Sequence, residues 1–177
     1  AIESDEDFSN GDYYDGNHPK KGLSLARMIG HKVFISLRTL ASRASKEIKK
    51  EEDSSWYQIQ SSIESYMLHQ GQKFVKRFDA NTYLRILDAW QNFDILDECE
   101  FNDYKEMFSR CSHQKYLIFT INSDVCFYPH HQEELSASLT EGGIDPMHIT
   151  VHSEKGHDSF LLEPELFAPH ISYALNN

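Results

Sequence analysis

The sequence predicts an α/β fold in which a mostly helical domain precedes parallel strands connected by crossover helices. Between residues 19 and 110 the apolar residues follow helical spacing, and no strand signal interrupts them. Residues 115–121 (KYLIFTI) are a short, nearly continuous apolar run, which is typical of a parallel strand covered on both faces. A helical pattern, a second strand pattern and a last helical pattern follow. We therefore predict a helical domain over residues 1–112 and a strand-bearing core over residues 113–177.

The helical half begins after Pro19, which suits the first turn of a helix because the backbone nitrogen needs no partner there. The stretch that follows, Gly22–Leu37, is apolar almost all round and predicts a buried helix. Asp79 precedes helix-forming residues and is a candidate N-cap. Further helices are predicted over residues 39–50, 59–78 and 80–93.

The second half alternates strands and helices. A glycine pair, Gly142 and Gly143, ends a predicted helix over residues 130–143. MHITVH (147–152) predicts the next strand, and residues 165–175 predict a closing helix. A strand, helix, strand order produces parallel neighbours through a right-handed crossover.

Composition argues against several classes of protein. A chain of 177 residues, 40% of them hydrophobic, can bury one sizeable core. Its formal net charge of −11 argues against a nucleic-acid surface, which needs clustered Lys and Arg. The basic cluster Lys46–Ser55 is interleaved with acids and is expected to be a solvated helix end and loop. No apolar run approaches the roughly 20 residues that span a bilayer, and the first residues do not resemble a signal peptide. Because there are only three cysteines, a reducing compartment, the cytoplasm, is expected.

Two candidate catalytic residues follow the two predicted strands. Asp124 lies in the turn after the first strand, and His157 lies in the loop after the second. Because the carboxyl ends of parallel strands open on the same edge of a sheet, the two side chains can meet there. A carboxylate that accepts a hydrogen bond from one imidazole nitrogen leaves the other nitrogen free as a general base. The alternative is that His157 is a surface or capping residue.

The sequence contains no recognisable nucleophile for this pair. In the α/β-hydrolase arrangement the order along the chain is nucleophile, acid, histidine, and the nucleophile lies on a Gly-x-Ser-x-Gly turn between a strand and a helix. No such turn occurs in the 177 residues. We therefore expect the nucleophilic serine to lie upstream of Ala1 in a longer polypeptide, and we expect the 177 residues alone to be inactive.

Five stretches resemble the C-terminal half of homoserine O-acetyltransferases, in the same order. They are NGDYY (10–14), GLSLARMIGH (22–31), IESYMLHQGQKFVKRFDANTYL (63–84), INSDVCFYP (121–129) and KGHDSFLLE (155–163). The resemblance covers nearly the whole chain, and the second and third stretches are distinctive of this family. It implies the C-terminal part of an α/β-hydrolase fold, preceded by a helical lid that would comprise residues 1–112.

The resemblance also implies an activity. Enzymes of this family transfer an acetyl group, or in some members a succinyl group, from coenzyme A to the hydroxyl of L-homoserine in methionine biosynthesis. Acetyl-CoA or succinyl-CoA would be a substrate, with no permanently bound cofactor. The missing serine would be acylated and then deacylated in a ping-pong mechanism, with His157 as the base and Asp124 orienting it. The apolar faces of the lid helices would form a homodimer.

Two further residues acquire roles from the resemblance, since Arg27 would bind the carboxylate of homoserine and Asp158 its ammonium group. The Arg27 role has independent support, because a guanidinium in an apolar helix requires an anion and a carboxylate offers bidentate geometry. The alternatives are that Arg27 pairs with Asp79 or Asp88, and that Asp158 caps a loop.

One position departs from the family pattern. Phe34 stands where these enzymes commonly carry a tyrosine. Either that hydroxyl is dispensable, or Tyr13, Tyr14 or Tyr66 supplies one.

Other interpretations of the sequence stay open. His130 and His131, with Glu133 and Glu134, could suggest a metal site, but adjacent histidines point to different sides of a helix start, and we predict no metal. Within the enzyme class, serine could replace homoserine as the acyl acceptor. Outside it, the chain could be a non-catalytic helical dimerisation module with a degenerate core.

Overall fold

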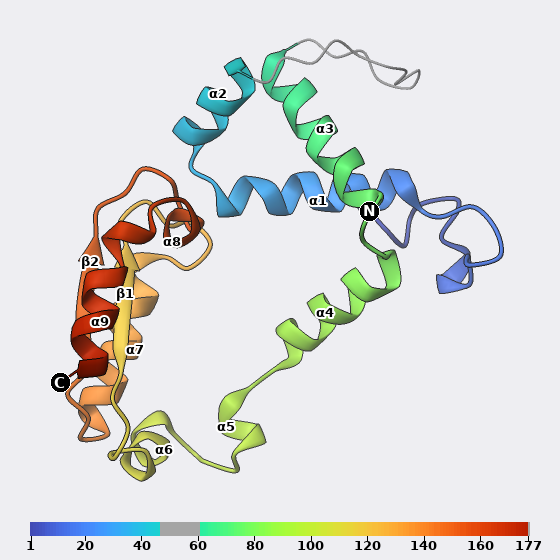
Figure 1. Cartoon of the computed structure of the whole chain (residues 1–177). Helices are drawn as coiled ribbons and strands as arrows, with labels where there is room; N and C mark the ends of the chain where they lie inside the picture. Colours follow the sequence, from blue (N-terminus) through green and yellow to red (C-terminus); the bar gives the residue numbers. More distant parts are fainter. Residues whose placement is uncertain (47–60, 177) are drawn as a thin grey trace. The chain divides into compact units, whose positions relative to one another are not determined.

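The computed structural model describes residues 1–46 and 61–176, which form two compact units (Figure 1). The first unit comprises Ala1–Val33 and Leu37–Asn92, and the second comprises Phe34–Ser36 and Phe93–Asn177. The sequence predictions that fall on residues 47–60, among them most of the cluster Lys46–Ser55, lie outside the described residues.

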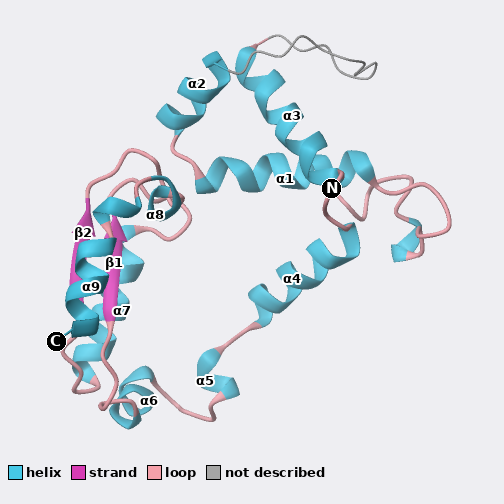
Figure 2. Ribbon diagram, in the orientation of Figure 1, coloured by secondary structure: helices cyan, strands magenta, loops and turns pink. Residues whose placement is uncertain are grey.

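The first unit is helical (Figure 2). Its elements are η1 (Ser9–Gly11), α1 (Lys20–Phe34), α2 (Leu37–Lys46), α3 (Ser62–Val75) and α4 (Ala80–Asn92). Helix α3 begins with a capping box, because Ser61 accepts from the backbone N–H of Glu64 while the Glu64 carboxylate accepts from the N–H of Ser61. The predicted N-cap of α4 is confirmed, since Asp79 accepts from the N–H of Thr82 at 2.8 Å.

The core of the first unit joins the N-terminal segment to the helices. Its buried members are Ile2, Tyr13, Leu23, Phe74 and Ala80. Tyr13 donates its hydroxyl to Asp79 at 2.6 Å and accepts from the N–H of Asn81 at 2.9 Å, so a buried tyrosine stabilises the start of α4.

The prediction of a buried helix over Gly22–Leu37 was wrong in two respects. Helix α1 ends at Phe34, and α2 begins at Leu37 after a two-residue break. In addition, α1 exposes an apolar stripe, because 48% of the surface of Leu25 and 62% of that of Ile29 remain accessible. These residues recur every four positions on one side, and no described element of the first unit covers that side.

The second unit is built on two parallel strands. They are β1 (Leu117–Ile121) and β2 (Met147–Val151), paired in register from Leu117 opposite Met147 to Ile121 opposite Val151. The helices of this unit are α5 (Ile95–Glu98), α6 (Tyr104–Arg110), α7 (Pro129–Glu141), α8 (Ser159–Leu162), η2 (Pro164–Leu166) and α9 (Ala168–Asn176). The predicted order of strand, helix, strand and helix is therefore confirmed, including the parallel pairing.

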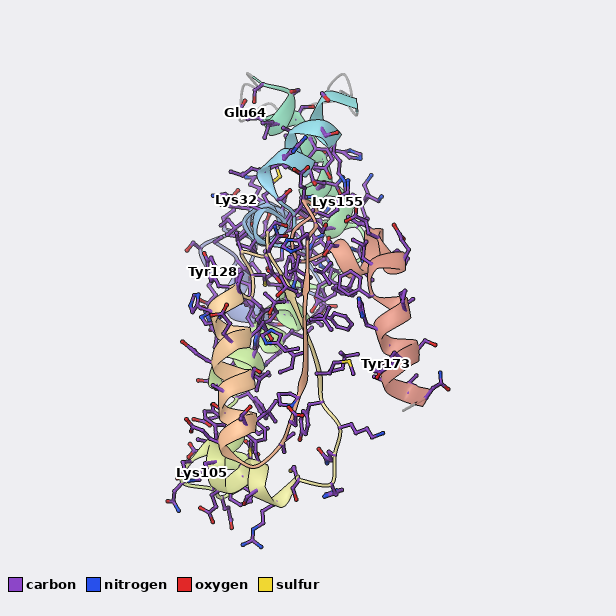
Figure 3. All side chains as sticks on the ribbon, turned by 90° about the vertical axis from the view of Figure 1, so that its left-hand side faces the viewer. Lys32, Glu64, Lys105, Tyr128, Lys155 and Tyr173 are labelled. Carbon is purple, nitrogen blue, oxygen red and sulfur yellow. The ribbon has the colours of Figure 1, made fainter. Side chains whose placement is uncertain are left out.

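Helices cover both faces of the strand pair. Figure 3 shows α7 on one side of the strands and α9 on the other. On the α7 side Ile118 packs in a buried cluster with Leu139, and on the α9 side Phe119 lies against Phe167 with ring centroids 5.1 Å apart. This double cover explains why β1 reads as a nearly continuous apolar run.

Helix α6 packs with the second unit. Met107 and Phe108 are buried in the same cluster as Leu139, and a side chain at Gly142 would meet the Cβ of Phe108 at 2.5 Å. The compact units therefore separate at residue 93, ahead of the predicted limit of the lid at residue 112. The sequence placed the limit later because α6 continues the helical pattern and only tertiary packing separates it from the helices before it.

Helix length and polarity also bear on membranes. Within residues 1–46 and 61–176 no helix combines the length and the apolar character needed to cross a bilayer.

Candidate active site

The loops that leave β1 and β2 are tied to each other at the carboxyl end of the strands. The N–H of Asn122 donates to the carbonyl of Val151 at 3.1 Å, and the Asn122 side chain accepts from the N–H of Ser153 at 2.9 Å. Further along the second loop, the N–H of Gly156 donates to the hydroxyl of Ser123 at 3.0 Å. These bonds fix the two loops side by side, as expected for the ligand-binding edge of a parallel sheet.

Asp124 and His157 meet between these loops. Nδ1 of His157 lies 2.8 Å from Oδ2 of Asp124, and the other carboxylate oxygen, Oδ1, accepts from the N–H groups of Cys126 at 2.8 Å and Phe127 at 3.0 Å. Only 6% of the Asp124 side chain is exposed, against 23% of the His157 side chain. The carboxylate is therefore buried and held by three hydrogen bonds, while the imidazole keeps an accessible edge.

This geometry assigns a proton. An ionised carboxylate can only accept hydrogen bonds, so Nδ1 of His157 must carry the hydrogen that Oδ2 of Asp124 accepts. In the neutral imidazole the lone pair then lies on Nε2. A ring held in this tautomer by a buried carboxylate is able to take a proton from a hydroxyl and return it to a leaving group.

Three phenylalanine rings surround the imidazole of His157. The ring centroids of Phe127, Phe160 and Phe34 lie 5.1, 5.6 and 5.7 Å from that of His157. Sequence reasoning missed the first two. The spacing gave a usable signal, because Phe127 and Phe160 each follow a candidate catalytic residue by three positions.

Asp158 lies directly after His157 at the start of α8. Its backbone N–H donates to the carbonyl of Phe34 at 3.1 Å, and its carbonyl accepts from the N–H groups of Leu161 and Leu162. Its carboxylate makes no capping hydrogen bond to α8. The alternative interpretation of Asp158 as a side-chain cap is therefore not supported.

Arg27 lies in the first unit, in a cluster on α1 and α3. Its Nη2 is 3.4 Å from Nδ1 of His31, and Nε2 of His31 is 3.2 Å from the hydroxyl of Tyr66. The guanidinium carbon also lies 5.1 Å from the centroid of the Phe74 ring, within the range of a cation–π contact. Burial first, and then the positive charges of Arg27 and Arg43, lower the pKa of His31 to about 4.

The alternative partner proposed for Arg27, Asp79, has a different environment. Its carboxylate accepts from the hydroxyls of Tyr13 and Tyr14 and from Thr82. These hydrogen bonds lower the pKa of Asp79 against the opposing effect of burial, which is the largest single influence. Asp79 therefore serves the N-terminus of α4.

The tyrosines considered as replacements for a hydroxyl at Phe34 all lie in the first unit, whereas Phe34 lies in the second. Tyr13 and Tyr14 bond to Asp79, and Tyr66 lies within hydrogen-bond distance of His31. Each hydroxyl therefore has a structural role in the unit that contains it.

No metal site stands out in the described part of the chain. Within it, no three His, Cys, Asp or Glu side chains gather closely enough to hold a metal ion, and the rings of His130 and His131 meet edge to face with centroids 4.2 Å apart. Burial raises the pKa of the Cys126 thiol, and the charges of Asp124 and Asp158 raise it further. A raised pKa disfavours the thiolate, which is the reactive form of a cysteine.

Comparison with known proteins gives homoserine acyltransferases among the relatives. A homoserine O-succinyltransferase of Nitrosomonas europaea is 35% identical over 100% of this chain and 47% of its own length. A homoserine O-acetyltransferase of Methanococcus vannielii is 34% identical over 92% of this chain and 32% of its own length. The chain thus spans about half the length of the curated relatives it matches, or less. No protein-family model matches it.

Solved structures show the same fold. A homoserine O-acetyltransferase from Bacillus anthracis superposes with a TM-score of 0.83 at 18% identity, covering 99% of this chain and 46% of that protein. An esterase superposes with the same TM-score at 19% identity. Both are α/β-hydrolase proteins, so the predicted fold class is confirmed. The resemblance inferred from the sequence is confirmed as well, because over most of its length the chain is homologous to homoserine O-acetyl- and O-succinyltransferases.

Proposed function

We propose that this chain is part of an acyltransferase that moves an acetyl or succinyl group from acyl-CoA to the hydroxyl of L-homoserine, a step in methionine biosynthesis. The observation that carries the proposal is the 2.8 Å contact between Nδ1 of His157 and Oδ2 of Asp124 at the carboxyl end of two parallel strands. The homology to homoserine acyltransferases supplies the substrates, and both acyl donors stay in the proposal because the relatives bear both names.

The reaction needs a nucleophilic serine from outside the 177 residues. In the first half, Nε2 of His157 takes the proton of that serine while the serine oxygen attacks the thioester carbonyl. The carbon–sulfur bond breaks, and the departing CoA sulfur takes the proton from His157 to leave as the free thiol. Asp124 keeps the imidazole in the required tautomer and stabilises its cationic form.

In the second half, the homoserine hydroxyl gives its proton to His157, and the serine oxygen receives it. Nε2 of His157 takes the proton of the homoserine hydroxyl while the homoserine oxygen attacks the acyl-serine carbonyl. The serine oxygen leaves and recovers a proton from His157, which completes the cycle with O-acylhomoserine as product. In this proposal Asp158 pairs with the ammonium group of homoserine, and Arg27 binds its carboxylate with two parallel hydrogen bonds.

The test is thiol release from acetyl-CoA and from succinyl-CoA, each with and without homoserine or serine. The longer polypeptide that carries the serine should release thiol continuously only with homoserine, and the 177 residues alone should release none. His157→Ala in the longer polypeptide should lower the rate by orders of magnitude. Dependence on serine instead would reassign the acceptor. A competent 177-residue chain, or a polypeptide inactive with every donor and acceptor, would overturn the proposal.

A further inference from the structure

A three-residue segment far from the strands in sequence belongs to the second unit. Phe34–Ser36, which is the last residue of α1 and the two residues before α2, lies against the loop that carries His157. The carbonyl of Phe34 accepts from the N–H of Asp158 at 3.1 Å, and the N–H of Ser36 donates to the carbonyl of Lys155 at 3.4 Å. The hydroxyl of Ser36 also donates to the carbonyl of Glu154. The segment therefore holds the backbone of the loop on both sides of His157. Figure 3 labels Lys155 in this loop.

Gly156 shows how close this contact is. Its φ of +76° lies in the left-handed region, where glycine pays no steric penalty. A Cβ at this position would lie 2.8 Å from the backbone nitrogen of Ser36 and 3.2 Å from the carbonyl oxygen of Phe34. Backbone atoms cannot move aside as a flexible side chain can, so this position requires glycine for two separate reasons.

The hydrogen bond to Asp124 does not by itself orient the imidazole. It fixes one ring atom, and the plane of the ring then depends on the side chains that pack around it. Phe127 lies on the loop that carries Asp124, and Phe160 lies in α8, directly after the loop that carries His157. Phe34 differs, because its own carbonyl is bonded to the residue after His157 while its ring lies 5.7 Å from the imidazole at 52°.

We propose that the segment Phe34–Ser36 is a clamp for the catalytic loop and that Phe34 is a positioning residue for His157. Phe34 contributes an aromatic ring beside the imidazole and an anchored backbone carbonyl. The consequence for catalysis rests on the proposed function, but the positioning itself concerns only His157 and is measured without substrate.

The first experiment compares Phe34→Leu with Phe34→Tyr by NMR of the 177-residue chain. The readout is the exchange with water of the Nδ1 proton of His157, which is slow only while the bond to Asp124 holds. We expect Phe34→Leu to speed this exchange by up to about tenfold, the factor that corresponds to one aromatic pair. Phe34→Tyr keeps the ring and should restore the slow rate. Phe119→Leu, which removes a ring from the cluster with Phe167, is the control for a general loss of packing.

The second experiment compares Gly156→Ala with Gly143→Ala. Both glycines have a positive φ, +76° and +84°, so both alanines suffer the same backbone strain. Only Gly156 has neighbours, since a Cβ at Gly143 would meet nothing within 4 Å. Gly156→Ala should therefore disturb the Nδ1 proton of His157, and Gly143→Ala should lower stability while leaving that proton unchanged.

These outcomes distinguish the clamp proposal from the acyltransferase proposal. A slow Nδ1 exchange in Phe34→Leu, or the same effect from both glycine substitutions, would overturn the clamp whatever the enzyme does. Because no acyl donor is present, loss of the acyltransferase proposal would leave these measurements valid. In the longer polypeptide the same Phe34→Leu change should lower the rate of thiol release before homoserine enters and leave the KM for homoserine unchanged. Substitution of a residue that only lines the acceptor site should instead raise the KM for homoserine and leave that rate unchanged.

Discussion

His31 in the first unit and His157 in the second are both held by polar partners and aromatic rings, yet their electrostatic surroundings are opposite. His31 is 6% exposed and faces Arg27 and Arg43, and its pKa is lowered to about 4 by burial and by those charges. His157 faces a buried carboxylate, that of Asp124. The nearest charge is thus positive at His31 and negative at His157.

The two rings also hold opposite tautomers. Arginine can only donate, so Nδ1 of His31 must accept from Arg27, and Nε2 must carry the hydrogen that the hydroxyl of Tyr66 accepts. A carboxylate can only accept, so His157 carries its hydrogen on Nδ1. In one chain, therefore, the neighbouring charge decides which nitrogen keeps a free lone pair.

Asp124→Asn is the substitution expected to disturb this comparison most. The amide oxygen of Asn can still accept from the N–H groups of Cys126 and Phe127, but its NH₂ group would face Nδ1 of His157 and favour the other tautomer. In the longer polypeptide we expect thiol release to fall by roughly 10⁴-fold with little change in thermal stability. Asp145→Asn, at an exposed position in the same unit, is the matched control. An active Asp124→Asn enzyme would show that the tautomer is unimportant.

His31 gives the second largest effect, through pH. Its pKa in the folded chain, about 4, lies below the value of 6.5 in the unfolded chain, so the unfolded chain binds the proton more readily between these values. Stability should therefore fall as the pH drops from about 6.5 to 4, by about 3 kcal/mol in all, and this group should add no further loss below pH 4. Tyr66, Arg27 and Arg43 are the groups that face His31, and none of them would stabilise a positive charge on its imidazole.

His31→Gln separates this effect from other titrations. Glutamine can accept from Arg27 and donate to Tyr66 but does not ionise in this range. Thermal unfolding between pH 4 and 7 should be less steeply dependent on pH in this variant than in the parent chain. His113→Gln, at an exposed position, is the control for removing a histidine. Equal pH slopes for the parent chain and His31→Gln would contradict the assigned role.

Sequence reasoning reached the pair Asp124 and His157 but not the surroundings that orient it. The pair was predictable because strand periodicity and parallel topology place the residues after two strands at one edge of the sheet. The contact of Phe34 with His157 was not predictable, because helical periodicity continues from residue 22 to residue 37 and conceals the break after Phe34. Such a contact depends on tertiary packing between segments far apart in sequence. The role of His31 was missed for the same reason, since Tyr66 lies on another helix.

Tyr66→Phe has the smallest expected effect and identifies which partner sets the tautomer of His31. The hydroxyl of Tyr66 can donate or accept and so has no preference of its own, whereas Arg27 can only donate. Removing the hydroxyl leaves the buried Nε2–H without that acceptor and should lower the free energy of unfolding by about 1 kcal/mol. The hydrogen should nevertheless stay on Nε2, which the ¹⁵N shifts of the ring at pH 7 would report. If it moves to Nδ1 instead, Tyr66 rather than the charge of Arg27 sets the tautomer, and the contrast with His157 loses its electrostatic basis.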